Sequence, residues 1–172
     1  MPKLNQRAFT LIELLIVIVI LAILAALLAV SYTQIQKSAR DKQRTADLQS
    51  VAAMLERFYS DTSQYPASNT GQISYYTGGT DCNTNAGGGT LKTAVWGTDG
   101  VDCNGKNYTK QLPKNIAAGA STLEFCYETT TVAPYQSYNL YAVLEGSGNL
   151  TTKVDCGASS GQKYNYKITS ND

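Results

Sequence analysis

The chain has 172 residues, enough for one domain of ordinary size with one modest hydrophobic core. Its 14 basic and 13 acidic residues leave a net charge of +1, so bulk charge points neither to nucleic acid nor to a charged partner. The sequence contains no histidine, the commonest general base and metal ligand, which argues against most enzyme classes.

The N-terminal part of the chain carries its strongest signal. Residues 1–8 form a short polar leader, and an apolar run follows from Phe9 to Val30. As a helix, this run of about 22 residues would span roughly 33 Å, close to the thickness of a bilayer's hydrocarbon core. A cleaved secretory signal is the alternative, but its apolar region is shorter, about 7–15 residues. The run therefore predicts a membrane-spanning helix over residues 9–30.

A second helical pattern follows directly. From Ser31 to about Ser60, apolar residues recur at the three- and four-residue spacing of one helix face, namely Leu48, Val51, Ala52, Leu55, Phe58 and Tyr59. Since no Gly or Pro interrupts residues 9–65, one helix ending at about residue 62 is the simplest prediction, with Tyr65-Pro66 beyond its end. A break near Ser31-Tyr32 is the alternative.

Beyond Pro66 the sequence is typical of loops and strands. Glycines punctuate residues 67–110, which predicts a long, irregular, glycine-rich loop region with little regular structure. Strand-like runs follow at Thr122–Glu128, Tyr138–Leu144, Leu150–Val154 and Tyr164–Thr169. We expect an α+β fold, in which the C-terminal half of the long helix packs on a small antiparallel sheet of three or four strands.

The four cysteines all follow the long helix, and their even number fits two disulfides in an oxidising compartment. Three connectivities are possible; Cys82–Cys103 around the glycine-rich loop and Cys126–Cys156 across the sheet are favoured. Zinc is the competing interpretation, but no Cys-x-x-Cys pair and no histidine accompany the cysteines.

The run from Arg7 to Ile18, RAFTLIELLIVI, closely resembles the class III signal of type IV pilins and type II secretion pseudopilins. The resemblance implies that a prepilin peptidase cuts between Ala8 and Phe9 and N-methylates Phe9, which leaves Glu13 as the fifth mature residue. The family usually has Gly before the cut. Since Ala8 is also small, we expect slower processing at worst.

The resemblance also implies a function and a set of partners. Residues 1–8 would be a cleaved leader, 9–30 the transmembrane and filament-core half of the helix, and 31–172 a globular headgroup. The chain would be a structural subunit of a prokaryotic type IV pilus-like filament, made of copies of itself and extracted from the bilayer by an assembly platform with an ATPase. A type II secretion or competence pseudopilin, or a minor pilin, is the alternative, and a membrane-tethered DNA-binding or adhesive domain is a third hypothesis.

Glu13 has a physical interpretation that does not need the family. A carboxylate in an apolar helix costs about 2.5–3.5 kcal/mol in lipid on insertion scales, so it should face a protein partner or be neutralised. Cutting after Ala8 would create a cationic amine at Phe9, which could pair with Glu13 of a neighbouring subunit and set the register of packed helices. The alternative is a solvated Glu13 at the membrane surface.

Two further segments have side chains that could take part in binding. The run from Asp99 to Gly105 is rich in oxygen ligands, yet it lacks the spacing of a calcium loop, and a turn is favoured. Lys106, Lys110 and Lys114, with Tyr108 between them, could contact nucleic acid, although a solvated surface is the more ordinary interpretation. No catalytic set, metal site or cofactor is predicted.

Overall fold

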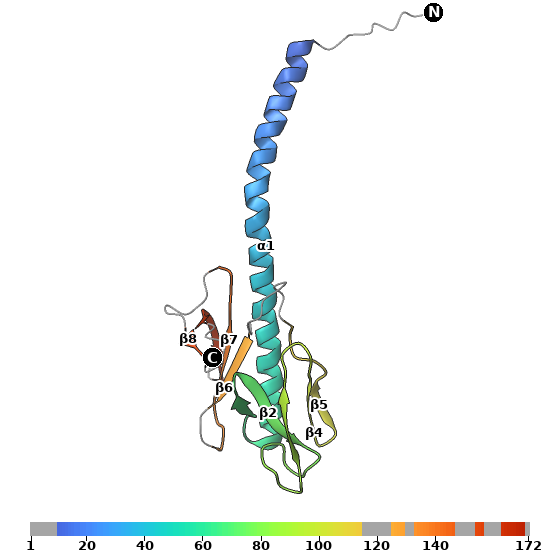
Figure 1. The fold of residues 1–172 in the computed structure, drawn as a ribbon, viewed down its shortest axis with the longest axis vertical. Helices are drawn as coiled ribbons and strands as arrows, with labels where there is room; N and C mark the ends of the chain where they lie inside the picture. The colour runs from blue at the N-terminus through green and yellow to red at the C-terminus, as the bar shows by residue number, and fades with distance from the viewer. Residues whose placement is uncertain (1–9, 115–124, 130–132, 147–153, 157–162, 171–172) are drawn as a thin grey trace, which may run out of the picture. The chain divides into compact units, whose positions relative to one another are not determined.

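The computed structural model describes residues 10–114, 125–129, 133–146, 154–156 and 163–170 (Figure 1). The chain divides into two compact units, Met1–Ala39 and Arg40–Asp172. Helix α1 (Leu11–Thr62) contributes to both units, and every described strand belongs to the second. The strands are β1 (Ala67–Asn69), β2 (Gln72–Thr77), β3 (Thr90–Ala94), β4 (Val101–Cys103), β5 (Lys106–Thr109), β6 (Phe125–Thr129), β7 (Tyr138–Ala142), β8 (Val154–Asp155), β9 (Lys163–Tyr164) and β10 (Tyr166–Thr169).

Helix α1 is continuous over 52 residues, so the alternative of a break near residues 31–32 is wrong. The helix ends where the sequence predicts. The Thr62 hydroxyl donates to the Phe58 carbonyl (2.8 Å), and Ser63 takes a left-handed conformation with φ of 61°. Such a residue just after a helix turns the chain away from the helix axis. Pro66 follows three residues later and could not continue the helix.

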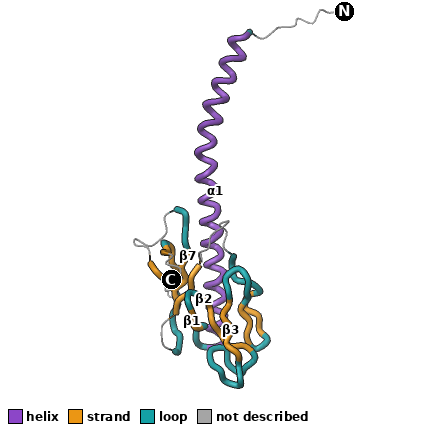
Figure 2. Tube along the Cα trace, in the orientation of Figure 1, coloured by secondary structure: helices purple, strands orange, loops and turns teal. Residues whose placement is uncertain are grey.

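The strands form small antiparallel sheets. One three-stranded sheet has the order β1-β2-β3 and another the order β10-β7-β6, while β4-β5 and β8-β9 form two-stranded pairs. Within the second unit they lie around the C-terminal stretch of α1 (Figure 1), and Figure 2 shows the loops that join them. The fold is therefore α+β with a pilin-like long helix, but its strands are spread over several small sheets.

The expectation of little regular structure in residues 67–110 is wrong, because β1 to β5 lie there. Several glycines mark tight turns between paired strands. Thr70-Gly71 joins β1 to β2 with φ values of 48° and 81°, and Asn104-Gly105 joins β4 to β5 with φ values of 50° and 74°. Two successive positive φ values are typical of a type I′ turn, whose twist matches that of the two strands of a hairpin. Gly71 and Gly105 therefore make the turns that let neighbouring strands pair.

The later strands match the predicted runs in position, with different ends. β7 and β10 lie inside the runs predicted at 138–144 and 164–169, and β6 covers the end of the run at 122–128. The pair β8-β9 is only two residues per strand. Residues 122–124 and 150–153 of the predicted strands lie outside the described residues.

The predicted amphipathic face of α1 forms the core of the second unit. Leu48, Leu55 and Phe58 are completely buried, and Val51 is 3% exposed. They belong to one cluster with residues from the surrounding strands, including Ile73 and Tyr75 of β2, Tyr127 of β6, and Tyr138 and Leu140 of β7. Many of the chain's tyrosines thus serve as large core side chains, whose rings pack against one another edge-on or tilted.

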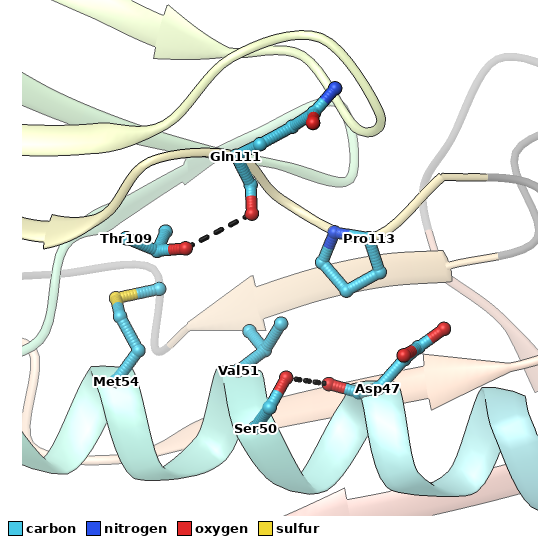
Figure 3. A pocket seen from close by; sticks show the side chains of 7 residues that line it. All are labelled: Asp47, Ser50, Val51, Met54, Thr109, Gln111 and Pro113. Carbon is cyan, nitrogen blue, oxygen red and sulfur yellow. Dashed lines mark hydrogen bonds between the residues drawn. The ribbon is translucent and has the colours of Figure 1, made fainter.

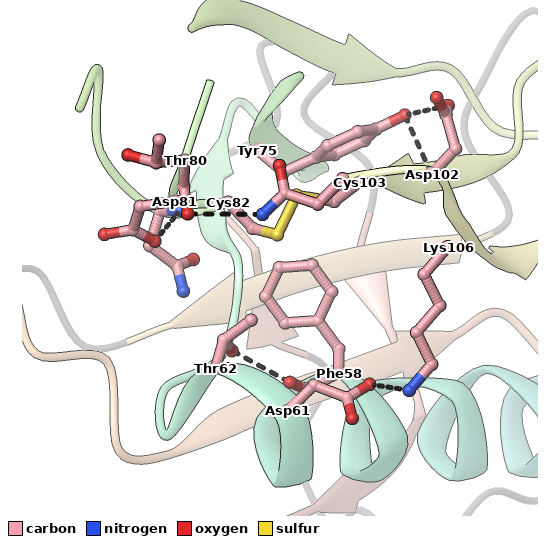
Figure 4. The surroundings of a disulfide bond; sticks show 12 residues. Phe58, Asp61, Thr62, Tyr75, Thr80, Asp81, Cys82, Asp102, Cys103 and Lys106 are labelled. Atoms are coloured by element: carbon pink, nitrogen blue, oxygen red, sulfur yellow. Dashed lines mark hydrogen bonds and ion pairs between the residues drawn. A yellow bond between two sulfur atoms is a disulfide. The ribbon is translucent and has the colours of Figure 1, made fainter. Parts of the chain in front are cut away.

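Two disulfides hold the strand-rich region together. Cys82, in the loop after β2, is bonded to Cys103 at the end of β4 (Figure 4), and Cys126 of β6 is bonded to Cys156 just after β8. The sequence separations are 21 and 30 residues. In the chain-entropy model a cross-link closing a loop of this size stabilises the fold by about 3–4 kcal/mol. This contribution matters in a domain with a small core and many turns.

Replacing Phe58 tests the role of the helix face. Because Phe58 is fully buried and its ring lies 5.0 Å from that of Tyr108, we expect Phe58→Ala to lower the free energy of unfolding by about 3–5 kcal/mol. Urea unfolding of the full-length protein in detergent micelles, followed by near-ultraviolet circular dichroism, measures the change. Ala53→Ser, at an exposed position of the same helix, should change it by less than about 0.5 kcal/mol. Equal losses in the two variants would contradict the packing described here.

Candidate functional site

The N-terminal unit presents apolar side chains on every side of α1. From Leu11 to Leu27 these side chains are exposed, ranging from 48% for Val19 to 82% for Leu11. The helix is long and apolar enough to cross a membrane, and none of its most apolar stretch is buried within the chain. A helix that is apolar all round is stable only when lipid or other protein surrounds it. The described part of the chain does not supply that cover.

Glu13 lies in the first turn of this apolar helix, where it forms a capping box with Thr10. The Thr10 amide and the Thr10 hydroxyl both donate to Oε2 of Glu13, each at 2.8 Å. In return, the Glu13 amide donates to Oγ1 of Thr10 at 3.3 Å. Each residue thereby satisfies a backbone N–H that the helix start leaves without a partner. The carboxylate also faces the positive end of the helix dipole.

This arrangement gives Glu13 a partner inside its own chain, which the sequence analysis missed. The signal was present, because Thr10-Leu11-Ile12-Glu13 has the threonine-to-glutamate spacing of a capping box. All three bonds engage Oε2 or the backbone, and among the described residues Oε1 of Glu13 accepts no hydrogen bond. Glu13 is exposed, so this second oxygen is accessible to a donor from another molecule. The predicted processing residues Ala8 and Phe9 lie outside the described part of the chain.

A cluster of four charged side chains lies where α1 enters the second unit. Arg40 holds Glu145 through two hydrogen bonds of 2.6 Å, one to each carboxylate oxygen. Arg44, with only 3% of its side chain exposed, reaches Oδ1 of Asp41 at 3.0 Å and Oε1 of Glu145 at 3.3 Å. Asp41 in turn accepts the amides of Glu145 and Gly146, both at 2.8 Å. The cluster fastens the segment after β7 to the helix.

The cluster lowers the pKa of the Glu145 carboxyl group. Its pKa falls from the ordinary 4.5 to about 2, mainly because Arg40 donates to the carboxylate, with the charges of Arg40 and Arg44 adding to the effect and burial opposing it. The same bond raises the pKa of Arg40. Glu145 is therefore ionised at any pH at which the domain is expected to work, and the nearly buried Arg44 keeps its counter-charge.

The oxygen-rich run from Asp99 to Gly105 is occupied by internal bonds. Oδ2 of Asp99 accepts the amide of Val95 at 3.0 Å. Oδ1 of Asp102 accepts both the amine of Lys92 and the hydroxyl of Tyr75, each at 3.1 Å. Among the described residues, no group of three or more Asp, Glu or Cys side chains is placed to hold a metal ion. The run contains the favoured turn, and the structure adds the β4-β5 hairpin, which was not predicted.

The structure gives Tyr108 and the lysines of the possible nucleic-acid contact different surroundings. Tyr108 is only 7% exposed, its ring packs on Phe58, and its hydroxyl donates to Oδ2 of Asp61 at 2.8 Å. Its ring therefore has no open face on which a base could stack. Lys106 is also paired with Asp61, as Figure 4 shows, while Lys110 and Lys114 are exposed. The aromatic part of that hypothesis is wrong.

A hollow of about 200 Å³ lies between α1 and the segment after β5 (Figure 3). Val51, Met54 and Pro113 give it apolar walls, with Asp47, Ser50, Thr109 and Gln111 at its rim. Both hydroxyls at the rim donate to backbone carbonyls, Ser50 to Asp47 at 2.7 Å and Thr109 to Gln111 at 3.0 Å. Neither hydroxyl is paired with a base, so the hollow does not have the geometry of a nucleophilic active site.

The comparisons with known proteins agree with the N-terminal signal. Residues 3–29 match the family model described as the prokaryotic N-terminal methylation motif. Neither the search of curated proteins nor the search of solved structures found a match.

The matched motif defines the class of signal that the chain carries. It is the class III prepilin signal of type IV pilins and pseudopilins, and the match covers Ala8, Phe9, Thr10 and Glu13. The motif and the fold together support a subunit of type IV pilin or pseudopilin type. Such subunits are structural and do not form an enzyme class.

The capping box can be tested at Thr10. Thr10→Val removes the hydroxyl that accepts the Glu13 amide, so we expect the first helical turn to lose about 1 kcal/mol. The amides of Glu13 and Leu14, which donate to the hydroxyl and the carbonyl of Thr10, should then exchange with deuterium about fivefold faster in full-length protein in micelles. Thr10→Ser keeps a hydroxyl and should exchange like the parent protein. Unchanged exchange in Thr10→Val would rule out the cap.

The ion cluster predicts a dependence of stability on pH. Because the pKa of Glu145 is lowered on folding, its stabilising contribution is present above about pH 4.5 and is lost as the pH falls towards 2. We expect Glu145→Gln to lower the free energy of unfolding by about 1–2 kcal/mol at pH 7.

Urea unfolding at pH 7, 4.5 and 2 measures this change. The difference between the variant and the parent protein should shrink across that range and be smallest at pH 2, where about half of the parent's carboxylate is protonated. A difference that stays constant with pH would mean that packing, and not charge, explains the loss.

Proposed function

We propose that this chain is a structural subunit of a type IV pilus-like filament, made as a membrane-anchored precursor and assembled by packing of its N-terminal helix. The observation that carries the proposal is the helix from Leu11 to Leu27, apolar on every side and uncovered, with Glu13 in its first turn. Lipid covers these side chains in the precursor. Neighbouring copies of the same helix replace the lipid in the filament.

Removal of residues 1–8 prepares the subunit for assembly. A prepilin peptidase cuts between Ala8 and Phe9 and methylates the new amine of Phe9, which remains cationic at neutral pH. Glu13 of a neighbouring subunit accepts this amine, since an ion pair with good geometry lowers the cost of keeping a carboxylate away from water. In the precursor, the capping box with Thr10 gives the same carboxylate two donors at 2.8 Å. Glu13 is thus satisfied in both environments.

The contact between helices is heterologous, because the amine of one copy meets the carboxylate of another. A head-to-tail contact that does not close produces an open helical fibre. Residues 9–30 then form the core of the fibre, while the globular part of residues 31–172 faces the outside of the cell. An assembly platform driven by an ATPase supplies the work of extraction from the bilayer.

The alternative is a type II secretion or competence pseudopilin, or a minor pilin, with the same processing and the same helix packing. The prepilin signal is common to these roles and does not distinguish between them. The abundance of the protein distinguishes between them. A pilus subunit is the main component of long surface filaments, whereas a pseudopilin or minor pilin is scarce. A DNA-binding or adhesive tether is the less favoured hypothesis, because an anchor alone has no need for Glu13 or for a processed amine.

Substitution of Glu13 tests the proposal directly. Glu13→Leu removes the acceptor for the neighbour's amine. We therefore expect the number of surface filaments, counted by electron microscopy, to fall at least about tenfold. Ile12→Leu, which preserves the apolar character next to Glu13, should assemble like the parent chain.

Mass spectrometry of the filament subunit completes the test. Its mass should correspond to a chain that begins at Phe9 and carries one added methyl group. Normal filaments from Glu13→Leu would show that the carboxylate does not set the register. A mature subunit that retains residues 1–8 would overturn the proposed function as a whole.

A further inference from the structure

Strand β3 has an open edge. In an antiparallel sheet, the backbone groups of alternate residues point to opposite sides of a strand. The amide of Tyr76 in β2 donates to the carbonyl of Cys82 at 2.7 Å, so it points away from β3. Leu91 is the residue opposite Tyr76, and Thr93 is opposite Ser74. The N–H and C=O groups of Leu91 and Thr93 therefore point away from β2, and β3 has no second neighbour among the described strands.

β3 and the residue directly after it carry the exposed large apolar side chains described in the second unit. Of the large apolar residues described from Arg40 onward, Leu91 and Val95 are the two that are highly exposed, at 53% and 41%. Leu91 and Thr93 lie on the same face of β3, and the hydroxyls of Thr93 and Ser74 are hydrogen-bonded to each other at 2.9 Å. Ala94, on the opposite face, is completely buried.

An open edge next to exposed apolar side chains is a surface for pairing with another extended segment. The edge is short, because the amide of Val95 is already bonded to Asp99, which leaves the backbone groups of two residues. A stable complex between separate proteins buries about 800 Å² on each partner, far more than two side chains and a short strand offer. The surface therefore suits a partner that other contacts already hold nearby.

We propose that the edge of β3, with Leu91 and Val95, is a lateral contact between the globular parts of neighbouring copies of this chain. The inference rests on the proposed function, since packing of the apolar helices supplies the high local concentration that such a weak contact needs. An extended segment of a second copy pairs with the backbone of Leu91 and Thr93 and covers the two apolar side chains. The contact adds resistance to dissociation and is not required for assembly to begin.

Deuterium exchange at single residues tests the contact in the protein as it exists. The amides of Leu91 and Thr93 are compared between filaments of the full chain and the same subunits dispersed in detergent. We expect exchange to be about tenfold slower or more in filaments, because these amides gain acceptors only there. The amide of Tyr76 is the control, since its acceptor Cys82 lies in the same chain and its exchange should change much less.

The variant Leu91→Ser with Val95→Ser provides a second, independent measurement. Both side chains are exposed, so the thermal midpoint of the dispersed subunit should stay close to the parent value. Filaments should still form, but the fraction that survives shearing or dilute detergent should fall several-fold. Thr90→Ser, at an exposed position of the same strand, should leave that fraction unchanged.

The possible outcomes separate the two proposals. Absence of filaments from the parent chain overturns the proposed function and this contact with it. Filaments in which Leu91 and Thr93 exchange as fast as in dispersed subunits overturn the contact alone. The contact alone is also overturned if filaments of the double variant resist shear as well as the parent filaments.

Discussion

Helix α1 must be covered along two stretches that require different partners. Between Leu11 and Leu27 its apolar side chains surround the axis, so no single protein surface in the chain could cover them. Between Leu48 and Phe58 they occupy one face, which the surrounding strands and loops bury. Because water is a poor solvent for both stretches, the first depends on lipid or on other helices, and the second holds the globular part together. The need to bury the face from Leu48 to Phe58 explains the sheets and the tyrosine-rich core around it. The need to cover the stretch from Leu11 to Leu27 explains assembly.

Two sets of charged side chains lie on helix α1, one in its first turn and one at the start of the globular unit. Each set has defined hydrogen-bond or ion-pair partners. Glu13 is capped by Thr10 in the first turn, where the helix dipole also favours a negative charge. Farther along, Arg40 and Arg44 are neutralised by Asp41 and Glu145, which fastens the strands to the helix at the start of the globular unit. The first arrangement lets a carboxylate enter an apolar environment without losing its hydrogen bonds. The second keeps a nearly buried guanidinium paired.

Local patterns predicted much of this molecule, and their failures have physical causes. The absence of Gly and Pro predicted a single helix, and the spacing from Leu48 to Phe58 predicted its buried face. Glycines were misread in residues 67–110, because Gly71 and Gly105 make hairpin turns whose paired strands are too short to show a clear alternation. Tyr108 looked like a surface aromatic among lysines, yet the alternation of β5 turns its ring into the core. Thr10 was overlooked although its spacing to Glu13 is a recognised cap.

The sequence by itself determined the features that depend on neighbours in the chain. These are the prepilin-type signal, the apolar run, the helix and its end near Thr62, and the amphipathic face, since each follows from the spacing of residues within a few turns. Only the tertiary structure decided which distant residues meet. Glu145 reaches Arg40 across 105 positions, Cys82 reaches Cys103 across 21, and Leu91 is left exposed on an open edge. No local pattern encodes these contacts, because they arise from how separate strands pack around the helix, which is a property of the whole folded chain.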